Sequence, residues 1–418
     1  MQTLYQAILL LALVPLVLGM ASAAIERAWI TVPMLATLVG IVAGPQVAGW
    51  IDPQAWPQPQ VILREAARIT IAVSVLGIAI RTPPESYRRA WRPALALLTL
   101  GMAGIWAMSS AVSWAALGLG PAAALLLGAI LTPTDPVTAT SIVTGPFAEQ
   151  ALPDRLRSTL SLESGANDGL GYLFVMLPMT VIEGRTDLAF IWLVDVLLHD
   201  VLGAVAIGAA LGWLTAQALR LSDRHGLAEQ HSFHGLTIAL SLAALALGRA
   251  LDTDGVLAAF AAGASFCLSA DRREDFEEQS VQETISKLMN VPIFTLFGLT
   301  IPWGGWAVLG WPLWLLLPGV LLLRRLPVVL ALRPWLKGFS RQDTIFAAWF
   351  GPIGVAAIFY GLDASLHTGD MLFWYAASAM VAASLLVHGI TAAPGLRAYG
   401  RGEGGGAGEG GGGGEDRV

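Results

Sequence analysis

Charged residues are scarce in this chain. Only 13% of its 418 residues are Asp, Glu, Lys or Arg, whereas about a quarter is usual in soluble globular domains. Hydrophobic residues make up 55% of the sequence. This composition excludes an ordinary soluble protein, and it predicts an all-α integral membrane protein whose main partner is the lipid bilayer.

Cysteine is nearly absent. The single Cys267 excludes an intramolecular disulfide and any metal site built from cysteines. The formal net charge of -6 carries little information, because acidic residues hardly affect membrane topology and the positions of Lys and Arg decide it.

Long apolar runs predict about thirteen transmembrane spans, since a helix needs ~17 to 25 apolar residues to cross a bilayer. We place them near residues 4–22, 29–48, 63–80, 94–117, 121–143, 158–182, 188–219, 233–250, 254–270, 288–303, 306–332, 344–362 and 371–393. The first run also resembles a signal peptide. However, no Lys or Arg precedes Glu26 and the run is long for a signal core, so we expect a span. The chain then divides into a transmembrane domain, 1–396, and a Gly-rich tail, 397–418, expected to be disordered.

Basic residues fall in alternate loops. They are Arg27, then Arg81, Arg88, Arg89 and Arg92, then Arg155 and Arg157, Arg220 and Arg224, Arg272 and Arg273, and finally Arg333, Lys337 and Arg341. Loops rich in Lys and Arg stay on the cytoplasmic side. We therefore expect the N-terminus outside and the C-terminus in the cytoplasm, in a plasma or bacterial inner membrane.

Two carboxylates and an amide interrupt the run 158–182. An ionisable residue at that depth costs ~3 kcal/mol and by default marks a functional site. Residues i and i+4 share one face of a helix. Glu163 therefore lies over Asn167, and Ser164 lies over Asp168. The second pair is a plausible half-site for a bare cation.

A second half-site is predicted in the run 121–143, which Pro133 and Pro136 interrupt. Each proline frees a backbone carbonyl in the preceding turn. Inside a membrane such carbonyls are tolerated only where they line a cavity or are buried in protein, as in the broken helices of transporters. Hard cations prefer oxygen ligands. Asp168, Ser164, Asp135 and the carbonyl of Thr134 are the candidates.

A similar break is predicted in the run 344–362, at Gly351, Pro352 and Gly354. If spans 1–6 and 8–13 form an inverted repeat about the seventh span, the two broken spans are counterparts that cross at the membrane midplane. Their half-helices would present opposed backbone dipoles there, which the carboxylates must complement.

Two arginines lie inside the run 306–332. An arginine stays charged and forms forked bonds to carboxylates, so one of them is expected to pair with Glu163. We prefer Arg325 to Arg324, although either could instead extend to the cytoplasmic surface.

Together these motifs resemble the monovalent cation/proton antiporters of NhaP type. The fungal plasma-membrane Na+/H+ antiporters and their bacterial relatives are the most similar branch. The resemblance rests on Thr132–Val137, Gly145–Ala148, Glu163–Gly169, Arg325–Pro327 and Phe350–Val355, and it covers roughly residues 4–393. It implies a secondary active transporter rather than an enzyme, with no cofactor beyond the transported ions. It also implies a homodimer with a rigid dimer domain and a moving six-helix core.

The resemblance assigns roles to individual residues. Asp168 would bind the cation and the proton in alternation, and Asn167 would be the neutral neighbour typical of electroneutral members. Asp135, the Thr134 backbone and Ser164 would complete the cation shell, while Glu163 and Arg325 would form a structural ion pair. The sequence departs from many relatives at Ile353, where they have an arginine, and in the third span, where only Thr70 and Ser74 are polar.

These observations predict electroneutral exchange of one Na+ or Li+ for one H+. A K+/H+ antiporter of the same fold stays open as an alternative. An intramembrane aspartyl protease using Asp135 and Asp168 is disfavoured, because Asn167-Asp168-Gly169 lacks that family's Gly-x-Gly-Asp pattern. No nucleic-acid partner is expected. We interpret His231 and His234 as part of a solvated loop rather than a pH sensor, and His388 as a packed residue.

Overall fold

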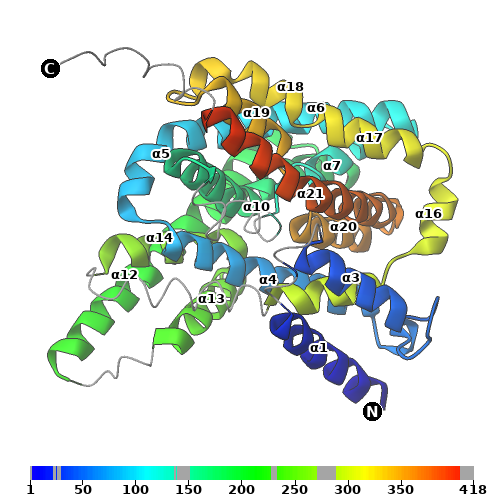
Figure 1. Cartoon of the computed structure of the whole chain (residues 1–418), viewed down its shortest axis with the longest axis horizontal. Helices are drawn as coiled ribbons and strands as arrows, with labels where there is room; N and C mark the ends of the chain where they lie inside the picture. The colour runs from blue at the N-terminus through cyan, green and yellow to red at the C-terminus, as the bar shows by residue number, and fades with distance from the viewer. Residues whose placement is uncertain are drawn as a thin grey trace, which may run out of the picture.

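The computed structural model describes residues 2–21, 25, 30–135, 138, 151–226, 233–270 and 289–404. These residues form helices and connecting loops without a strand (Figure 1), so the predicted all-helical class is confirmed for this part of the chain. The predictions that concern Pro136, Gly145–Ala148 and His231, and the side chain of His234, lie outside the described residues.

The first half of the chain supplies eight of the labelled helices. They are α1 (Gln2–Met20), α3 (Val32–Ala43), α4 (Pro59–Arg81), α5 (Pro84–Ala96), α6 (Met102–Leu117), α7 (Pro121–Ile130), α10 (Asp154–Ile182) and α12 (Gly203–Arg224). A π-helical stretch, Leu97–Gly101, joins α5 to α6, and the short α11 (Leu188–Phe190) leads through a second one, Ile191–Leu202, into α12.

The second half supplies the remaining labelled helices. They are α13 (Phe233–Ala250), α14 (Gly255–Ser269), α16 (Trp303–Leu309), α17 (Leu313–Leu323), α18 (Leu326–Ala331), α19 (Arg341–Trp349), α20 (Val355–Thr368) and α21 (Leu372–Gly404).

Four helical segments within the described residues are long and apolar enough to cross a membrane. They are Pro84–Leu117, Leu188–Arg224, Leu313–Ala331 and Leu372–Gly400. A fifth candidate consists of the helix Met289–Leu299 and α16, which are bent by 63° relative to each other. Several shorter apolar helices accompany them. The molecule is thus a multi-pass membrane protein, while the number thirteen and the inverted repeat stay predictions.

The structure differs from the sequence-based boundaries at two places. The run 306–332 is not one helix, because α17 ends at Leu323 and α18 begins at Leu326. The helix α21 continues to Gly404, beyond the predicted domain boundary at residue 396. It continues because Leu396 and Tyr399 are buried in a cluster with Phe346 and Phe350. Apolar packing therefore keeps the first turns of the supposed tail helical.

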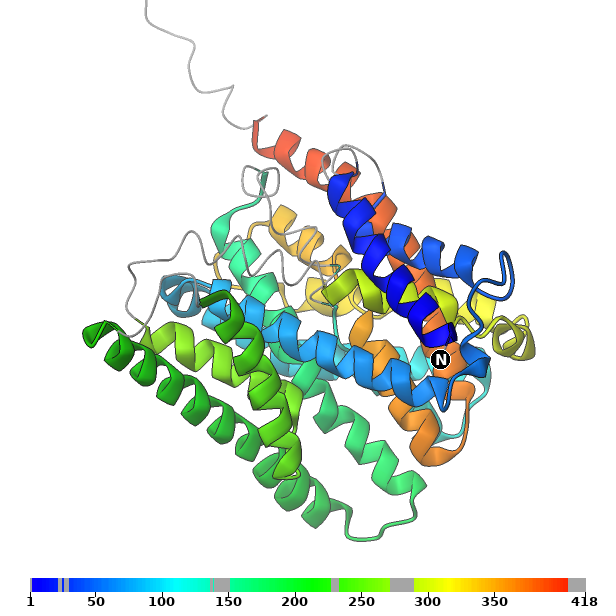
Figure 2. The same ribbon diagram turned by 90° about the horizontal axis from the view of Figure 1, so that it is seen from below.

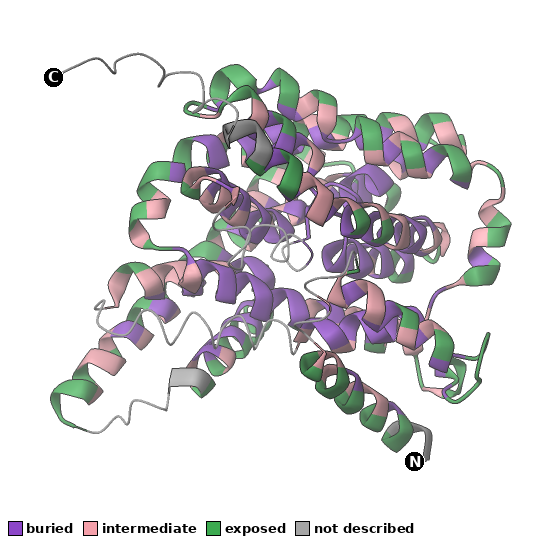
Figure 3. Ribbon diagram, viewed as in Figure 1, coloured by how far each residue is buried: buried purple, intermediate pink, exposed green. Residues whose placement is uncertain are grey.

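The most buried helices lie at the centre of the molecule (Figure 3). Large parts of α4, α10, α14 and α20 are buried, whereas α1, α12 and α17 expose large apolar side chains such as Leu16, Trp213 and Trp314. Lipid tails are as apolar as these side chains. The exposed apolar faces therefore suit contact with a bilayer. Of the central helices, α10 carries several buried polar side chains, Glu163 and Asp168 among them.

Small residues allow α12 to lie close beside α14 (Figures 1 and 2). A Cβ atom on Gly208 would overlap the backbone carbonyl of Ala258, and one on Gly212 would overlap that of Ala262. The two glycines are four residues apart and so lie on one face of α12. Their missing side chains permit the backbone contact that is typical of helices packed inside membranes.

The replacement Gly212→Leu should destabilise the protein, because the new side chain meets a backbone carbonyl that cannot rotate away. Overpacking of this kind costs ~1–3 kcal/mol or more. We expect a lower unfolding temperature of the purified protein in detergent. The control is Gly235→Leu in α13, where a Cβ atom would meet nothing within 4 Å. Equal unfolding temperatures for the two variants would contradict this role of Gly212.

Candidate functional site

Two helices break at the places that the sequence indicates. The helix α7 ends at Ile130 and an irregular stretch follows to Asp135, while α19 and α20 are separated by residues 350–354. The two breaks touch each other, since the backbone N–H of Asp135 donates to the carbonyl of Pro352 at 2.8 Å. The structure thus brings the two interrupted segments together deep in the protein.

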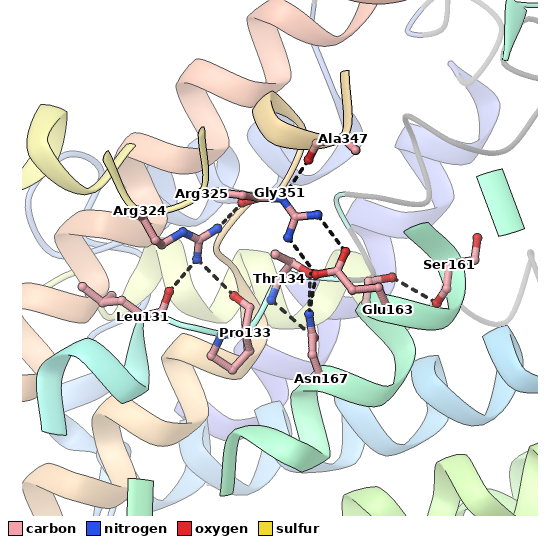
Figure 4. Close-up of polar contacts among 11 residues, drawn as sticks. Leu131, Pro133, Thr134, Ser161, Glu163, Asn167, Arg324, Arg325, Ala347 and Gly351 are labelled. Atoms are coloured by element: carbon pink, nitrogen blue, oxygen red, sulfur yellow. Dashed lines mark hydrogen bonds and ion pairs between the residues drawn. The ribbon is translucent and has the colours of Figure 1, made fainter. Parts of the chain in front are cut away.

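Arg324 binds backbone carbonyls from both breaks (Figure 4). Its guanidinium donates to the carbonyls of Leu131 and Pro133, which follow the C-terminal end of α7, and to that of Gly351, which follows α19. Helix C-terminal ends carry unpaired carbonyls and a partial negative charge. The carbonyls freed by the break are therefore occupied by an arginine from the same chain.

Arg325 forms a forked ion pair with Glu163 (Figure 4). Its two terminal nitrogens lie 2.7 and 2.8 Å from the two carboxylate oxygens, and its Nε donates to the carbonyl of Ala347 in α19. Both partners are almost fully buried, and so is Arg324. The alternative in which either arginine extends to the cytoplasmic surface is therefore wrong.

Asp135 lies at the N-terminal end of α20. One carboxylate oxygen accepts from the N–H of Val355 at 3.3 Å, and the other accepts from the N–H and hydroxyl of Thr138 at 2.9 and 2.6 Å. A side chain on Gly354 would overlap this carboxylate. A negative charge is favourable at the positive end of a helix. Asp135 thus complements α20 at the point where Gly354 leaves room for it.

Asn167 joins α10 to the first break. Its Nδ2 donates to the hydroxyl of Thr134 at 2.6 Å and to the carboxylate of Glu163 at 3.2 Å, and its Oδ1 accepts from the N–H of Thr134 at 3.3 Å. The contact between Glu163 and Asn167 is the one that the i, i+4 spacing predicts. All polar atoms of the amide are used in these bonds, so Asn167 acts as a bridge within the protein.

Asp168 is different from every other charged group in the site. It is only 1% exposed, and neither carboxylate oxygen has a hydrogen-bond partner in the described part of the chain. Its backbone carbonyl accepts from the hydroxyl of Tyr360 at 2.6 Å. Ser164, one turn before it on α10, donates to the carbonyl of Ser161. The backbone of Asp168 is therefore tied to α20, while its two carboxylate oxygens have no hydrogen-bond partner among the described residues.

Two side chains contact the second break: His388 is packed and hydrogen-bonded, as predicted, whereas the contact of Ser384 was not predicted. Ser384 accepts from the N–H of Ile353 at 2.7 Å, and the Nε2 atom of His388 lies 3.2 Å from the carbonyl of Trp349. Both side chains belong to α21 and are buried. The signal was a Ser and a His at i, i+4 in an otherwise apolar helix, a spacing that places two polar groups on one face.

Comparison with known proteins shows the family and the fold of the chain. Residues 8–398 match the family described as "Sodium/hydrogen exchanger, transmembrane". The chain belongs to this family. A similar fold is found in the sodium proton antiporter MjNhaP1 from Methanocaldococcus jannaschii, with a TM-score of 0.73 and 19% identity over 94% of this chain and 99% of that one.

Curated relatives of this chain include fungal and bacterial proteins. It is 32% identical to the Na(+)/H(+) antiporter of Saccharomyces cerevisiae over 80% of this chain, and 27% identical to that of Schizosaccharomyces pombe over 86% of this chain and 82% of the relative. It is 28% identical to the K(+)/H(+) antiporter NhaP2 of a Shewanella species over 91% of this chain and 64% of the relative. The chain spans only 35% of the length of the Saccharomyces protein.

The ion pair between Glu163 and Arg325 should be important for stability. Removing one partner of a buried pair leaves an uncompensated charge, which costs about 3–5 kcal/mol. We expect Glu163→Gln and Arg325→Met each to lower the unfolding temperature markedly, as measured by thermal unfolding in detergent. The double variant should be less destabilised than the sum of the two. Strict additivity would show that the two side chains are not coupled.

Proposed function

We propose that this chain exchanges Na+ for H+ across the membrane, with Asp168 as the group that binds the two ions in turn. The observation that carries the proposal is the buried carboxylate of Asp168, which has no partner in the described part of the chain. An ionised carboxylate in such a place is too costly to persist alone. It needs either a proton or a bound cation, and competition between these two is an exchange mechanism.

The balance of charges in the site supports an exchange of one ion for one proton. Around the crossing, Arg324 and Arg325 are matched by Glu163 and Asp135, so the fixed charges cancel before Asp168 is counted. The ionised Asp168 adds a single negative charge, which one proton or one monovalent cation neutralises. An aspartate in place of Asn167 would add a second charge. We therefore propose electroneutral exchange.

For the cation shell we propose Asp168, the hydroxyl of Ser164, a carboxylate oxygen of Asp135 and the backbone carbonyl of Thr134. Hard cations favour such oxygen ligands. The hydrogen bonds of Asn167 give it a different proposed role, which is to keep Thr134 and Glu163 in place without adding charge. Glu163 and Arg325 are proposed as the structural ion pair.

The proposed cation is Na+ or Li+, because the relatives above 30% identity are described as Na(+)/H(+) antiporters. K+ stays the alternative, since bacterial relatives at 28% are described as K(+)/H(+) antiporters. We also propose a homodimer in a plasma membrane, with the N-terminus outside. A protease is not favoured, because paired catalytic aspartates share a proton and neither oxygen of Asp168 has a hydrogen-bond partner in the described residues.

The replacement Asp168→Asn should abolish exchange, because an amide can carry neither a proton nor a cation in alternation. The assay is purified protein in liposomes, with an internal pH dye that reports the response to added Na+, Li+ or K+. We expect the wild-type response to be unchanged when the membrane potential is clamped, and the series of cations identifies the substrate.

The matched control is Asp154→Asn, which changes an exposed carboxylate at the start of the same helix α10. This variant should exchange at the wild-type rate. Exchange that survives in Asp168→Asn would remove Asp168 from its proposed role. A folded wild-type protein that responds to no cation would overturn the proposed function itself.

A further inference from the structure

A layered group of side chains lies between Asp168 and the far end of α20. This helix begins at Val355, whose N–H donates to Asp135, contacts the backbone of Asp168 through Tyr360, and ends at Thr368. The ring of Phe359 lies against that of Tyr360, with 4.9 Å between the centroids. The guanidinium of Arg68, from α4, lies 4.8 Å above the ring of Phe359. Aromatic rings and an arginine from another helix therefore cover this side of the site.

Beyond Phe359, a network of ion pairs links α4 to α20. Arg64 of α4 donates to Asp363 of α20 at 3.2 Å, and Arg68 lies 3.8 Å from the same carboxylate oxygen. Glu65 then bonds both arginines, to Arg64 at 2.9 Å and to Arg68 at 2.8 Å. Arg64 and Asp363 are 299 positions apart in the sequence, so the network joins two helices that are distant along the chain.

The exposed fraction of these residues rises with distance from Asp168, from Tyr360 to Glu65. Asp168 is 1% exposed, Tyr360 3% and Phe359 8%. The side chains of Arg68, Arg64 and Asp363 are 13%, 19% and 20% exposed, and that of Glu65 is 40% exposed. The side chains therefore become more exposed with distance from the backbone of Asp168, and the ion pairs form the last layer before the more exposed Glu65.

We propose that Arg64, Arg68 and Asp363 form a gate that closes the path between Asp168 and the face of the protein where α4 begins. This inference rests on the proposed exchange, in which Asp168 must meet the solution on each face in turn. In the present structure the gate is shut. It opens when α4 and α20 separate, which breaks the bonds of both arginines to Asp363 and lifts Arg68 from Phe359.

Half-buried ion pairs suit a gate. Exposed pairs contribute at most about 1 kcal/mol, whereas fully buried pairs such as Glu163 with Arg325 are costly to break. Asp363 and its arginines lie between these limits, and the freed charges find water as the layer opens. Asp363 also leaves a carboxylate at the mouth of the open path, where it attracts cations.

The test measures access to the site without relying on transport. The reporter is Asp168→Cys in a Cys267→Ala background, which leaves a single thiol. Oriented membrane vesicles are treated, from the face where α4 begins, with a membrane-impermeant uncharged methanethiosulfonate, whose local concentration does not depend on the charge of Asp363. Adding Asp363→Asn should raise the labelling rate roughly fivefold, in line with the loss of about 1 kcal/mol of ion pairing. Labelling from the opposite face should not rise.

The matched control again is Asp154→Asn, which removes a carboxylate paired with Arg157 at the other end of α10 and should leave the labelling rate unchanged. Equal rates with and without Asp363→Asn, including no labelling of either protein, would overturn the gate. Because the reporter lacks Asp168, this result does not depend on whether the chain exchanges Na+ for H+.

A second measurement tests whether the gate must open. Arg64→Cys and Asp363→Cys are combined in the Cys267→Ala background and joined by a short bifunctional thiol reagent with a cleavable disulfide. Exchange should be lost on cross-linking and return on reduction. The control pair, Asp154→Cys with Arg157→Cys, joins two positions of the same helix and should leave exchange intact. Undiminished exchange in the cross-linked Arg64/Asp363 protein would overturn the proposal.

Discussion

The site depends on one constraint, which is that backbone polar groups cannot be left unpaired inside a membrane. Each broken helix exposes carbonyls at one end and N–H groups at the other, and every unmet group costs several kcal/mol in hydrocarbon. Arg324 donates hydrogen bonds to carbonyls that follow α7 and α19, and Asp135 accepts a hydrogen bond from the first N–H of α20. The charged side chains at the crossing are therefore first of all the partners of the interrupted backbone.

This constraint separates two kinds of acidic residue on α10. Glu163 is satisfied by two bonds from Arg325 and is tied to the break through Asn167 and Thr134. Asp168 is five residues further along, and its carboxylate has no hydrogen-bond partner among the described residues. A rigid, neutral frame with one unmatched carboxylate binds a small positive ion without rearranging the frame. Preorganisation of this kind reduces the cost of binding.

Much of this arrangement could be predicted from the sequence because it rests on local rules. Prolines and glycines mark both breaks, and the i, i+4 spacing places Glu163 next to Asn167. A charged residue in an apolar run needs a partner of opposite sign, which limits the choices for Glu163 to Arg324 and Arg325. The partners of Arg324 could not be predicted, because backbone carbonyls have no signature in the sequence. The helical continuation to Gly404 depends on Tyr399 packing against Phe346, a contact between distant segments. The pairing of Arg64 with Asp363 was missed for the same reason.

In the proposed exchange, the charge of Asp168 also determines when the protein can change its shape. With neither ion bound, Asp168 adds a negative charge to a frame that is otherwise balanced, and moving that charge through a region of low dielectric is unfavourable. With a proton or a cation bound, the frame is neutral and this cost disappears. Rearrangement at the gate between α4 and α20 is then easy only when the site is occupied. In the proposed exchange, one buried carboxylate would thus account both for the competition between the two ions and for the absence of a leak, without a separate device for either.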